Sequence, residues 1–488
     1  MDWLWILLLT PIITGLIAWR IKTQICAWFQ VVGAVLTLTA GLAVAYQVMT
    51  GSSITAWDEF IYIDALGAFN IGLIVFVGFT ASLYSVGYMK YELSEGMITE
   101  RQFHHYFLLF HLFLFTMVAV SVVNSIGLMW VGIEITTIVS ALLVGMYQKE
   151  TALEAAWKYL IMGSVGISFA LIGIIFIYLS GVHVSGESPS ALNWTVLRQV
   201  SQDLNPKWML TAFVFVLIGF GTKAGLAPMH FWLPDAHSQA PSPVSAVLSG
   251  VLLNTALYGI LRIYAIANST LNGQVAQYMI FFGIFSIAIT VPFILVQHDL
   301  KRMLAYSSVE HIGIITLSVG IGGTLGLYGA LLHMFNHTMA KSLLFLAAGN
   351  INQKYRSKQM KRISGVLKSM PITGIVFLVA TFAITGTPPF NIFISEFTIM
   401  MAGFKAGYIG VTVSFLVLVV LIFAGMVQYV TKMTFGEAPT KLVSKEISFC
   451  STAALFIPLV MVVTCGLYVS PFLSEVIHKV SAILQGVQ

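Results

Sequence analysis

The sequence GLAPMHFWLP (225–234) interrupts an apolar stretch that extends from residue 209 to residue 239. Proline removes a backbone donor and clashes with the preceding helical turn, so a helix cannot run through this stretch unbroken. A second interruption, ITGTPPF (384–390), divides the apolar stretch over 372–402 in the same way. The two stretches therefore predict two broken helices.

The rest of the chain is too apolar for a soluble protein. Of its 488 residues, 58% are hydrophobic and 9% are charged, so most of the chain must lie in lipid. The apolar runs suit helices that cross a bilayer, and they lack the alternating pattern of a transmembrane barrel. We predict an all-α integral membrane protein with about fourteen transmembrane helices, of which the seventh and twelfth are broken: 3–19, 28–49, 66–88, 106–124, 126–146, 158–180, 209–239, 242–266, 275–297, 303–322, 325–348, 372–402, 409–433 and 450–472.

Positive charge is concentrated in alternate loops between these spans. The other loops carry only Arg198, Lys207, Lys405 and Lys479. Cytoplasmic loops of membrane proteins carry the excess of Lys and Arg, so we expect both termini on the non-cytoplasmic side of a prokaryotic inner (plasma) membrane. The loops assigned to the cytoplasm contain Arg20, Lys22, Lys90, Arg101, Lys149, Lys301, Arg302, six cations from Lys354 to Lys368, Lys432, Lys441 and Lys445.

Three further patterns restrict the class of protein. No cation precedes the first apolar stretch and no cleavage site follows it, so a removable signal peptide is not expected. Cys26, Cys450 and Cys465 lack the spacings of iron–sulfur, zinc or haem sites, which predicts no metal and no cofactor in this chain. The net charge of +5 comes from loop cations, so nucleic acid is not expected as a partner.

The two interruptions lie five spans apart, which indicates two five-helix repeats of opposite orientation. We expect an N-terminal three-helix region at 1–104 and a first repeat, helices 4 to 8, at 105–266. A second repeat, helices 9 to 13, is expected at 267–435, followed by a C-terminal helix at 436–488. Inverted repeats are typical of transporters.

Four charged side chains stand out within the predicted spans: Glu134, Lys223, Lys341 and Glu396. An ionisable group in hydrocarbon costs several kcal/mol unless it is paired or hydrated, so each is a candidate functional residue. The alternative is that each forms a structural ion pair between helices.

The eleventh span carries His333, His337 and Lys341 at intervals of four residues, which places them on one helical face. Histidine changes charge near neutral pH, and a desolvated lysine can release its proton there, so this stripe suits a proton relay with bound water. Hydrogen bonds for helix packing are the alternative, and they explain three aligned titratable groups poorly.

Polar residues also surround the first interruption, where His230, Asp235 and His237 follow one another. Backbone groups freed by the break could hold water or ions there. The seven-residue spacing of the two histidines matches no zinc pattern, so a metal site is not predicted.

Several other polar residues lie near estimated span ends, where a solvated role is expected: Asp64, His298, Asp299 and Glu310. Lys158 and His311 are expected to face the bundle axis instead. Whether Asp235 and Glu310 serve a relay or only the helix ends is left open.

Three stretches resemble the antiporter-like subunits of respiratory complex I: GLAPMHFWLPDAHSQAPSPVSAVLSG (225–250), DLKRMLAYSSVEHIG (299–313) and HMFNHTMAKSLLFLAAG (333–349). The resemblance extends from about Asp64 to Glu396. The stretches WVGIEITT (130–137), EAAWKYL (154–160) and LSGVLLNTALYG (248–259) are similar to those of the F-type membrane proteins of hydrogenase 4, which belong to the membrane-bound [NiFe] hydrogenases. Multi-subunit sodium/proton antiporters share the same fold.

The resemblance implies that Glu134 pairs with Lys223 at the interface with a neighbouring subunit. It also implies a proton axis that continues through Asn254, His333, His337, Lys341 and Glu396. Asn254 departs from the pattern, because many relatives carry a lysine there and an amide cannot bind and release a proton near pH 7. Water, His311 or His333 would have to replace that lysine.

Together these features predict a proton-translocating, non-redox subunit of a membrane oxidoreductase complex, of the membrane-bound [NiFe] hydrogenase or formate hydrogenlyase type. Its expected partners are the bilayer, other membrane subunits and, through them, a peripheral redox arm. The alternatives are a subunit of a sodium/proton antiporter or of a complex I NADH-quinone oxidoreductase, a membrane scaffold and a solute symporter.

Overall fold

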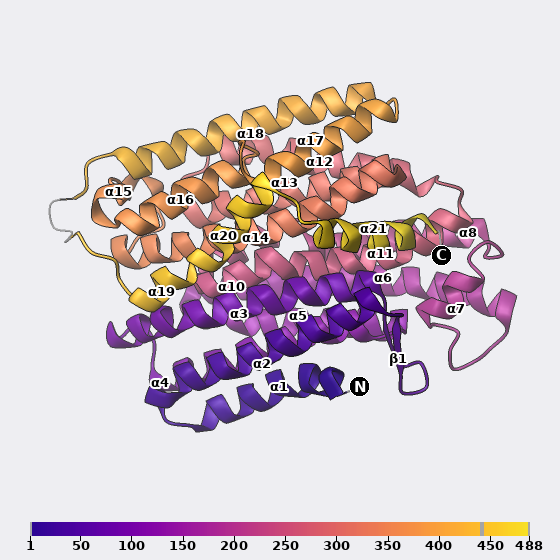
Figure 1. Ribbon diagram of the computed structural model, residues 1–488, viewed down its shortest axis with the longest axis horizontal. Helices are drawn as coiled ribbons and strands as arrows, with labels where there is room; N and C mark the ends of the chain where they lie inside the picture. Colours follow the sequence, from indigo (N-terminus) through magenta and orange to yellow (C-terminus); the bar gives the residue numbers. More distant parts are fainter. Residues whose placement is uncertain (1, 440–443, 487–488) are drawn as a thin grey trace.

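The computed structural model describes residues 2–439 and 444–486, and Lys441, one of the cations used for the orientation, lies outside this part. The chain forms a bundle of long helices that share one common direction (Figure 1). Helices α1 and α2 lie at one side of the bundle and α18 at the opposite side (Figure 1). The predicted all-α membrane fold is confirmed.

The N-terminal region consists of α1 (Asp2–Arg20), α2 (Thr23–Thr50) and α3 (Ala65–Ser94). A short antiparallel hairpin, β1 (Ile54–Ala56) and β2 (Ile61–Ile63), connects α2 to α3. Asp64 caps α3 by accepting a hydrogen bond from the Gly67 backbone N–H at 3.0 Å. The hairpin was not predicted, because three-residue strands leave no clear periodic signal.

The middle of the chain contains α4 (Glu100–Val122), α5 (Ile126–Val144), α6 (Glu150–Ser185), α7 (Trp194–Gln199), α8 (Pro206–Ala224), α9 (Trp232–Gln239), α10 (Ser242–Val247), the π-helix η1 (Leu248–Leu252) and α11 (Leu253–Thr270). The next part contains α12 (Val275–Leu295), α13 (Leu300–Ile321), α14 (Gly323–Tyr355), the short 3-10 helix η2 (Met360–Arg362), α15 (Val366–Ser369), α16 (Pro371–Ile384), α17 (Asn391–Lys405) and α18 (Ile409–Phe435). The chain continues through α19 (Phe449–Ala454), α20 (Phe456–Leu467) and α21 (Pro471–Gln485).

Both predicted interruptions are confirmed. Helix α8 ends at Ala224, the following Gly225 adopts the left-handed conformation with φ +84°, and α9 begins only at Trp232. Helix α16 is separated from α17 by a turn in which Gly386 has φ +67°. Glycine adopts this backbone region without steric cost, so each break is set by a glycine together with the prolines that follow it.

Within the described residues, twelve helices are long and apolar enough to cross a membrane. The fourteen predicted spans include two that are not among these twelve helices, namely α14 and the α16–α17 pair. Helix α14 has 33 residues but carries polar groups, and the break leaves α16 and α17 with 14 and 15 residues. The number fourteen therefore stays a prediction.

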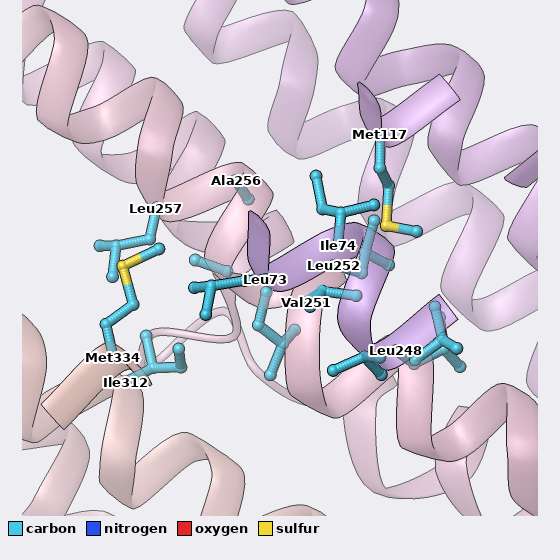
Figure 2. Packing of buried hydrophobic residues seen from close by; sticks show 14 of the residues in the cluster. Leu73, Ile74, Met117, Leu248, Val251, Leu252, Ala256, Leu257, Ile312 and Met334 are labelled. Carbon is cyan, nitrogen blue, oxygen red and sulfur yellow. The ribbon is translucent and has the colours of Figure 1, made fainter. Parts of the chain in front are cut away.

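The centre of the bundle is formed by α13 and by the continuous segment α10, η1 and α11. The most apolar stretch of each is completely buried. Figure 2 shows side chains of η1 among those of α3 and α11, including Leu73, Leu248, Val251, Leu252 and Leu257. Helices that touch protein on every side are free to carry polar groups that avoid lipid. Most candidate site residues lie on these central helices and on α5, α8, α14 and α17, whereas Lys158 lies on α6, His237 on α9 and His230 in the break before α9.

A buried ion pair fastens this centre to the N-terminal region. The Arg262 guanidinium on α11 donates to both Asp64 carboxylate oxygens, at 2.6 and 2.7 Å. The two side chains are 4% and 7% exposed. Arg262 also lies over the ring of Trp194, 4.5 Å from its centroid. Asp64 is therefore a buried structural residue, and its expected solvated role is wrong.

Both chain ends lie at one end of the bundle, with α7 and β1, and α15 lies at the other end (Figure 1). The cations near α15 are thus separated from the termini along the bundle axis. The side of the membrane on which the termini lie, and the division into repeats at 105–266 and 267–435, stay predictions.

Candidate functional site

Lys223 lies in the last turn of α8, directly before the first break, and it is 2% exposed. Its ammonium donates to the Thr137 hydroxyl at 2.8 Å and to the Tyr159 hydroxyl. The Tyr159 hydroxyl also contacts the Ser140 hydroxyl at 2.7 Å, and its ring stacks on Trp232 of α9. The partial negative charge of a helix C-terminus favours a cation at this position. Three hydroxyl-bearing side chains and a helix end thus surround one buried lysine.

Glu134 lies on α5 and is only half-buried. Its carboxylate accepts a hydrogen bond from the Ser164 hydroxyl of α6 at 2.7 Å and from the Thr137 hydroxyl at 3.4 Å. No ion pair within 4.0 Å joins Glu134 to Lys223 in the described part of the chain. The implied direct pairing is therefore corrected, because Thr137, one turn from Glu134 on the same face, lies between the two charges.

Asn254, where the resemblance implies a lysine, is completely buried on α11. Its amide donates to the Gly250 carbonyl at 2.9 Å and to the Thr338 hydroxyl at 2.8 Å. Thr338 lies on α14, three residues before Lys341. Asn254 thus joins the helix after the first break to the helix that carries the histidine stripe.

Lys341 is completely buried on α14 and points to α13. Its ammonium donates to the Leu304 carbonyl at 2.9 Å and to the Ser307 hydroxyl. No carboxylate lies within 4.0 Å of the Lys341 ammonium among the residues that the structure describes. Like Lys223, Lys341 is held by neutral oxygen atoms, which stabilise an ammonium without fixing it permanently in the charged form.

The predicted histidine stripe on α14 meets a third histidine on α13. The ring nitrogens His311 Nδ1 and His333 Nε2 lie 2.9 Å apart, and His333 Nδ1 lies 3.0 Å from the Ser395 hydroxyl of α17. The centroid of the His337 ring lies 5.3 Å from that of His311. All three rings are buried, so His311 faces the bundle interior as expected. A continuous path of titratable rings and hydroxyls runs from α13 to the second broken helix.

Glu396 lies at 5% exposure on α17, next to Ser395 and after the second break. A Cβ atom at Gly386 would overlap Glu396 Oε2. The turn at the break therefore leaves a space that the carboxylate fills, and only glycine leaves it open. Glu396 Oε1 has no hydrogen-bond partner in the described part of the protein.

The residues around the first break take different positions. His230 is buried and stacks on Phe231, and His237 is buried and stacks on Phe345 of α14. Asp235 lies at the bundle end, where it pairs with Arg302. Asp235 therefore belongs to a helix end.

Lys158 does not face the axis, and that expectation is wrong. Its side chain is 51% exposed and pairs with Glu154 at 2.5 Å and with Asp235 at 3.5 Å. One residue further along α6 the helix has turned by about 100°, which places Tyr159 rather than Lys158 beside Lys223.

Glu310 is also placed differently from its expectation. It lies in the middle of α13, between Leu300 and Ile321, and is 3% exposed. The span expected at 303–322 nearly coincides with α13, so the error was to assign an end-of-span role to a residue inside that span.

The hydroxyl groups around the two lysines and the histidine pair were not predicted as site residues. Thr137, Ser140, Tyr159, Ser307 and Ser395 carry no charge, so they give no hydropathy signal inside an apolar run. The spacing of Thr137 from Glu134, one helical turn, is the pattern that could have indicated one of them. That the chain holds no metal and no cofactor stays a prediction.

More than half of the chain matches one known protein family. Residues 123–422 match the family model described as "NADH:quinone oxidoreductase/Mrp antiporter, TM". The chain belongs to this family. A "Hydrogenase-4 component F homolog" of Methylacidiphilum infernorum (isolate V4) is 34% identical over 484 residues, which are 98% of this chain and 99% of the relative.

Two solved structures share the fold of this family member. One is a chain of the membrane-bound sulfane sulfur reductase, an archaeal respiratory membrane complex, with a TM-score of 0.85, 24% identity and coverage of 99% of both chains. The other is a chain of the Mrp complex from Dietzia sp. DQ12-45-1b, with a TM-score of 0.85, 20% identity and coverage of 99% of this chain and 96% of that one. Proteins of this family and fold thus occur as subunits of multi-subunit membrane complexes.

Proposed function

We propose that this chain is the proton-translocating, antiporter-like membrane subunit of a redox-driven complex of the membrane-bound [NiFe] hydrogenase or formate hydrogenlyase type. The similarity to a hydrogenase-4 component over nearly the whole length of both chains supports this type of complex. The chain would sit among other membrane subunits and, through them, be coupled to a peripheral redox arm.

The observation that carries the proposal is the environment of Lys223. Placing an ammonium inside a membrane protein costs several kcal/mol unless it is compensated, so packing alone does not account for a buried lysine without an ion-pair partner. Lys223 has neutral hydroxyl partners, and Thr137 connects it to the Glu134 carboxylate. A lysine in such surroundings can change its protonation when a nearby charge moves.

The mechanism follows from this arrangement. While the Glu134 carboxylate is ionised and close, its charge acts through the Thr137 hydroxyl to stabilise the Lys223 ammonium. A change in the neighbouring subunit that draws Glu134 away weakens this stabilisation, and Lys223 releases its proton toward the central helices. The proton then passes along the residues of α13 and α14 and leaves near Glu396.

No hydrogen bond joins the Lys223 cluster directly to the Lys341 cluster within the described residues. Between them lie Asn254 with Thr338, and His237 on the α14 side of α9. Bound water is the proposed carrier across this interval, because an amide cannot take up and release the proton.

We propose that the neighbouring subunit binds to the outer surface of α5 and α6. Half-buried Glu134 lies there among exposed apolar side chains, such as Ile135 and Ile138 on α5 and Ile161 and Val165 on α6. A carboxylate facing lipid is costly, so this surface is better suited to a partner that covers Glu134. We place the complex in the prokaryotic plasma membrane with both termini of this chain on the non-cytoplasmic side.

The alternative is a sodium/proton antiporter without a redox partner, and one experiment separates the two. The complete complex is purified, sealed into vesicles and supplied with formate or reduced ferredoxin while H2 formation and internal pH are followed. The proposal predicts proton movement that starts with H2 formation and does not occur with a sodium gradient alone. Proton movement driven by a sodium gradient in the absence of an electron donor would contradict it.

A further inference from the structure

Glu310 is a buried carboxylate that the mechanism above does not use. It lies halfway along α13, a helix surrounded by protein on every side. No ion pair within 4.0 Å joins Glu310 to a cation in the described part of the chain. A carboxylate in the middle of a membrane-embedded bundle without a structural ion pair points to function.

The neighbours of Glu310 belong to the second half of the pathway. Lys341 donates to Ser307, which lies one turn before Glu310 on the same face of α13. Glu310 also precedes His311 in the chain, and His311 reaches Ser395, the residue before Glu396, through His333. Glu310 therefore stands between a cation on α14 and a second carboxyl group on α17.

Glu310 and Glu396 are both buried, and two carboxyl groups buried in one membrane-embedded bundle cannot both carry a negative charge at low cost, so one of them tends to hold a proton. A pair that shares one proton next to a lysine is a chain of three sites between which that proton can be exchanged. The histidine pair His311 and His333 faces the same region from α13 and α14 and contacts Ser395, beside Glu396.

The sequence around Glu310 parallels that around Glu134. VEHIGIITLS (309–318) and IEITTIVSAL (133–142) both carry a glutamate directly after a β-branched residue. In the predicted repeats the span of Glu134 corresponds to the span of Glu310, and the broken helix of Lys223 corresponds to that of Glu396. Glu310 and Glu396 would then be the counterparts of Glu134 and Lys223.

We propose that Glu310 carries the proton from Lys341 to Glu396. The inference rests on the proposed function, because it concerns the same pathway. Bound water passes the proton of the Lys341 ammonium to the Glu310 carboxylate, since the two groups do not form an ion pair within 4.0 Å, and the transfer leaves an amine and a neutral acid. Glu310 then protonates Glu396 and returns to the carboxylate, so no species other than the proton is consumed.

The test compares Glu310→Gln with Glu92→Gln in the complete complex in sealed vesicles, with H2 formation as the measure of redox turnover. Glu92 is a matched control because it is equally buried and lies at the far end of α3, where it accepts a hydrogen bond from Gln353. Glutamine keeps the shape of glutamate but cannot carry a proton near pH 7. We expect Glu310→Gln to lower the number of protons moved per H2 by about tenfold or more, and Glu92→Gln to leave it unchanged.

Lys341→Ala separates the two claims. If Lys341→Ala abolishes pumping and an assembled Glu310→Gln complex pumps normally, the inference about Glu310 is overturned while the proposed function stands. If Lys223→Ala, Lys341→Ala and Glu310→Gln all pump normally, the proposed function itself fails.

If Glu310→Gln does not assemble, Glu310→Asp decides the question. This change keeps the acid but withdraws it by about 1.5 Å, one carbon–carbon bond. Slower pumping by an assembled complex would support a proton-carrying role, and an unchanged rate would overturn it.

Discussion

Removing the Thr137 hydroxyl would break the connection between the two charges of the first half of the pathway. The hydroxyl accepts a hydrogen bond from the Lys223 ammonium at 2.8 Å and lies 3.4 Å from a Glu134 carboxylate oxygen. Thr137→Val keeps the shape of the side chain and deletes only this polar group. Lys223 would then retain the Tyr159 hydroxyl as its remaining side-chain partner.

The size of the effect follows from the hydrogen bond that is lost. A hydrogen bond to a charged group contributes about 1.5–3 kcal/mol. Each 1.4 kcal/mol corresponds to a factor of about ten, so the loss amounts to about ten- to hundredfold in the population of the charged lysine. We therefore expect Thr137→Val to slow proton translocation by about tenfold or more, provided that loading of Lys223 limits the rate.

The assay follows proton movement and H2 formation together in vesicles that contain the complete complex. Thr136→Val is the matched control, because its hydroxyl is also buried on α5 but donates only to the Ile133 carbonyl of the same helix, at 2.6 Å. Thr137→Ser restores the hydroxyl and should restore pumping. If Thr137→Val pumps as fast as Thr136→Val, Thr137 does not link the two charges and the reasoning is wrong.

Three further outcomes are expected. Asp64→Asn leaves the buried Arg262 guanidinium without its carboxylate, so the free energy of unfolding should fall by about 3–5 kcal/mol. The loss would appear as a lower thermal unfolding temperature in detergent, and an unchanged temperature would contradict a structural role for the pair. Gly386→Ala places a Cβ on the position of Glu396 Oε2, so pumping should fail although the complex assembles, and normal pumping would refute the tight fit. Ile161 is 56% exposed on α6, so Ile161→Cys should cross-link to a neighbouring membrane subunit more efficiently than a cysteine placed on the outer face of α18. Equal cross-linking of the two variants would argue against a partner on α5 and α6.

The membrane fold could be predicted because it depends on signals that are local in the sequence. Apolar runs report burial in lipid, and the prolines at 225–234 and 384–390 report the two breaks through backbone sterics. Helix α14 was predicted at 325–348 from its apolar run, although its polar residues keep it out of the twelve most apolar helices.

The charged residues of the site could be predicted, but their surroundings could not. Glu134, Lys223, Lys341 and Glu396 stand out because charge is rare inside an apolar run. The direction of a side chain depends on the rotation of its helix in the bundle, which is why Lys158 was expected on the axis and Tyr159 was overlooked. The prediction for Glu310 failed for a related reason: the span was placed correctly, but the sequence does not show that α13 is enclosed by protein on every side, where a carboxylate in mid-span is not solvated.

The proposed mechanism of proton translocation depends most on Lys223, and substitution of this residue in the complete complex is the most direct test. Proton translocation and H2 formation would be compared between wild type, Lys223→Ala and Lys207→Ala, an exposed lysine in the first turn of the same helix. We expect Lys223→Ala to abolish proton translocation while Lys207→Ala pumps as wild type. Full pumping by an assembled Lys223→Ala complex would contradict the account and leave this chain a scaffold of the membrane arm.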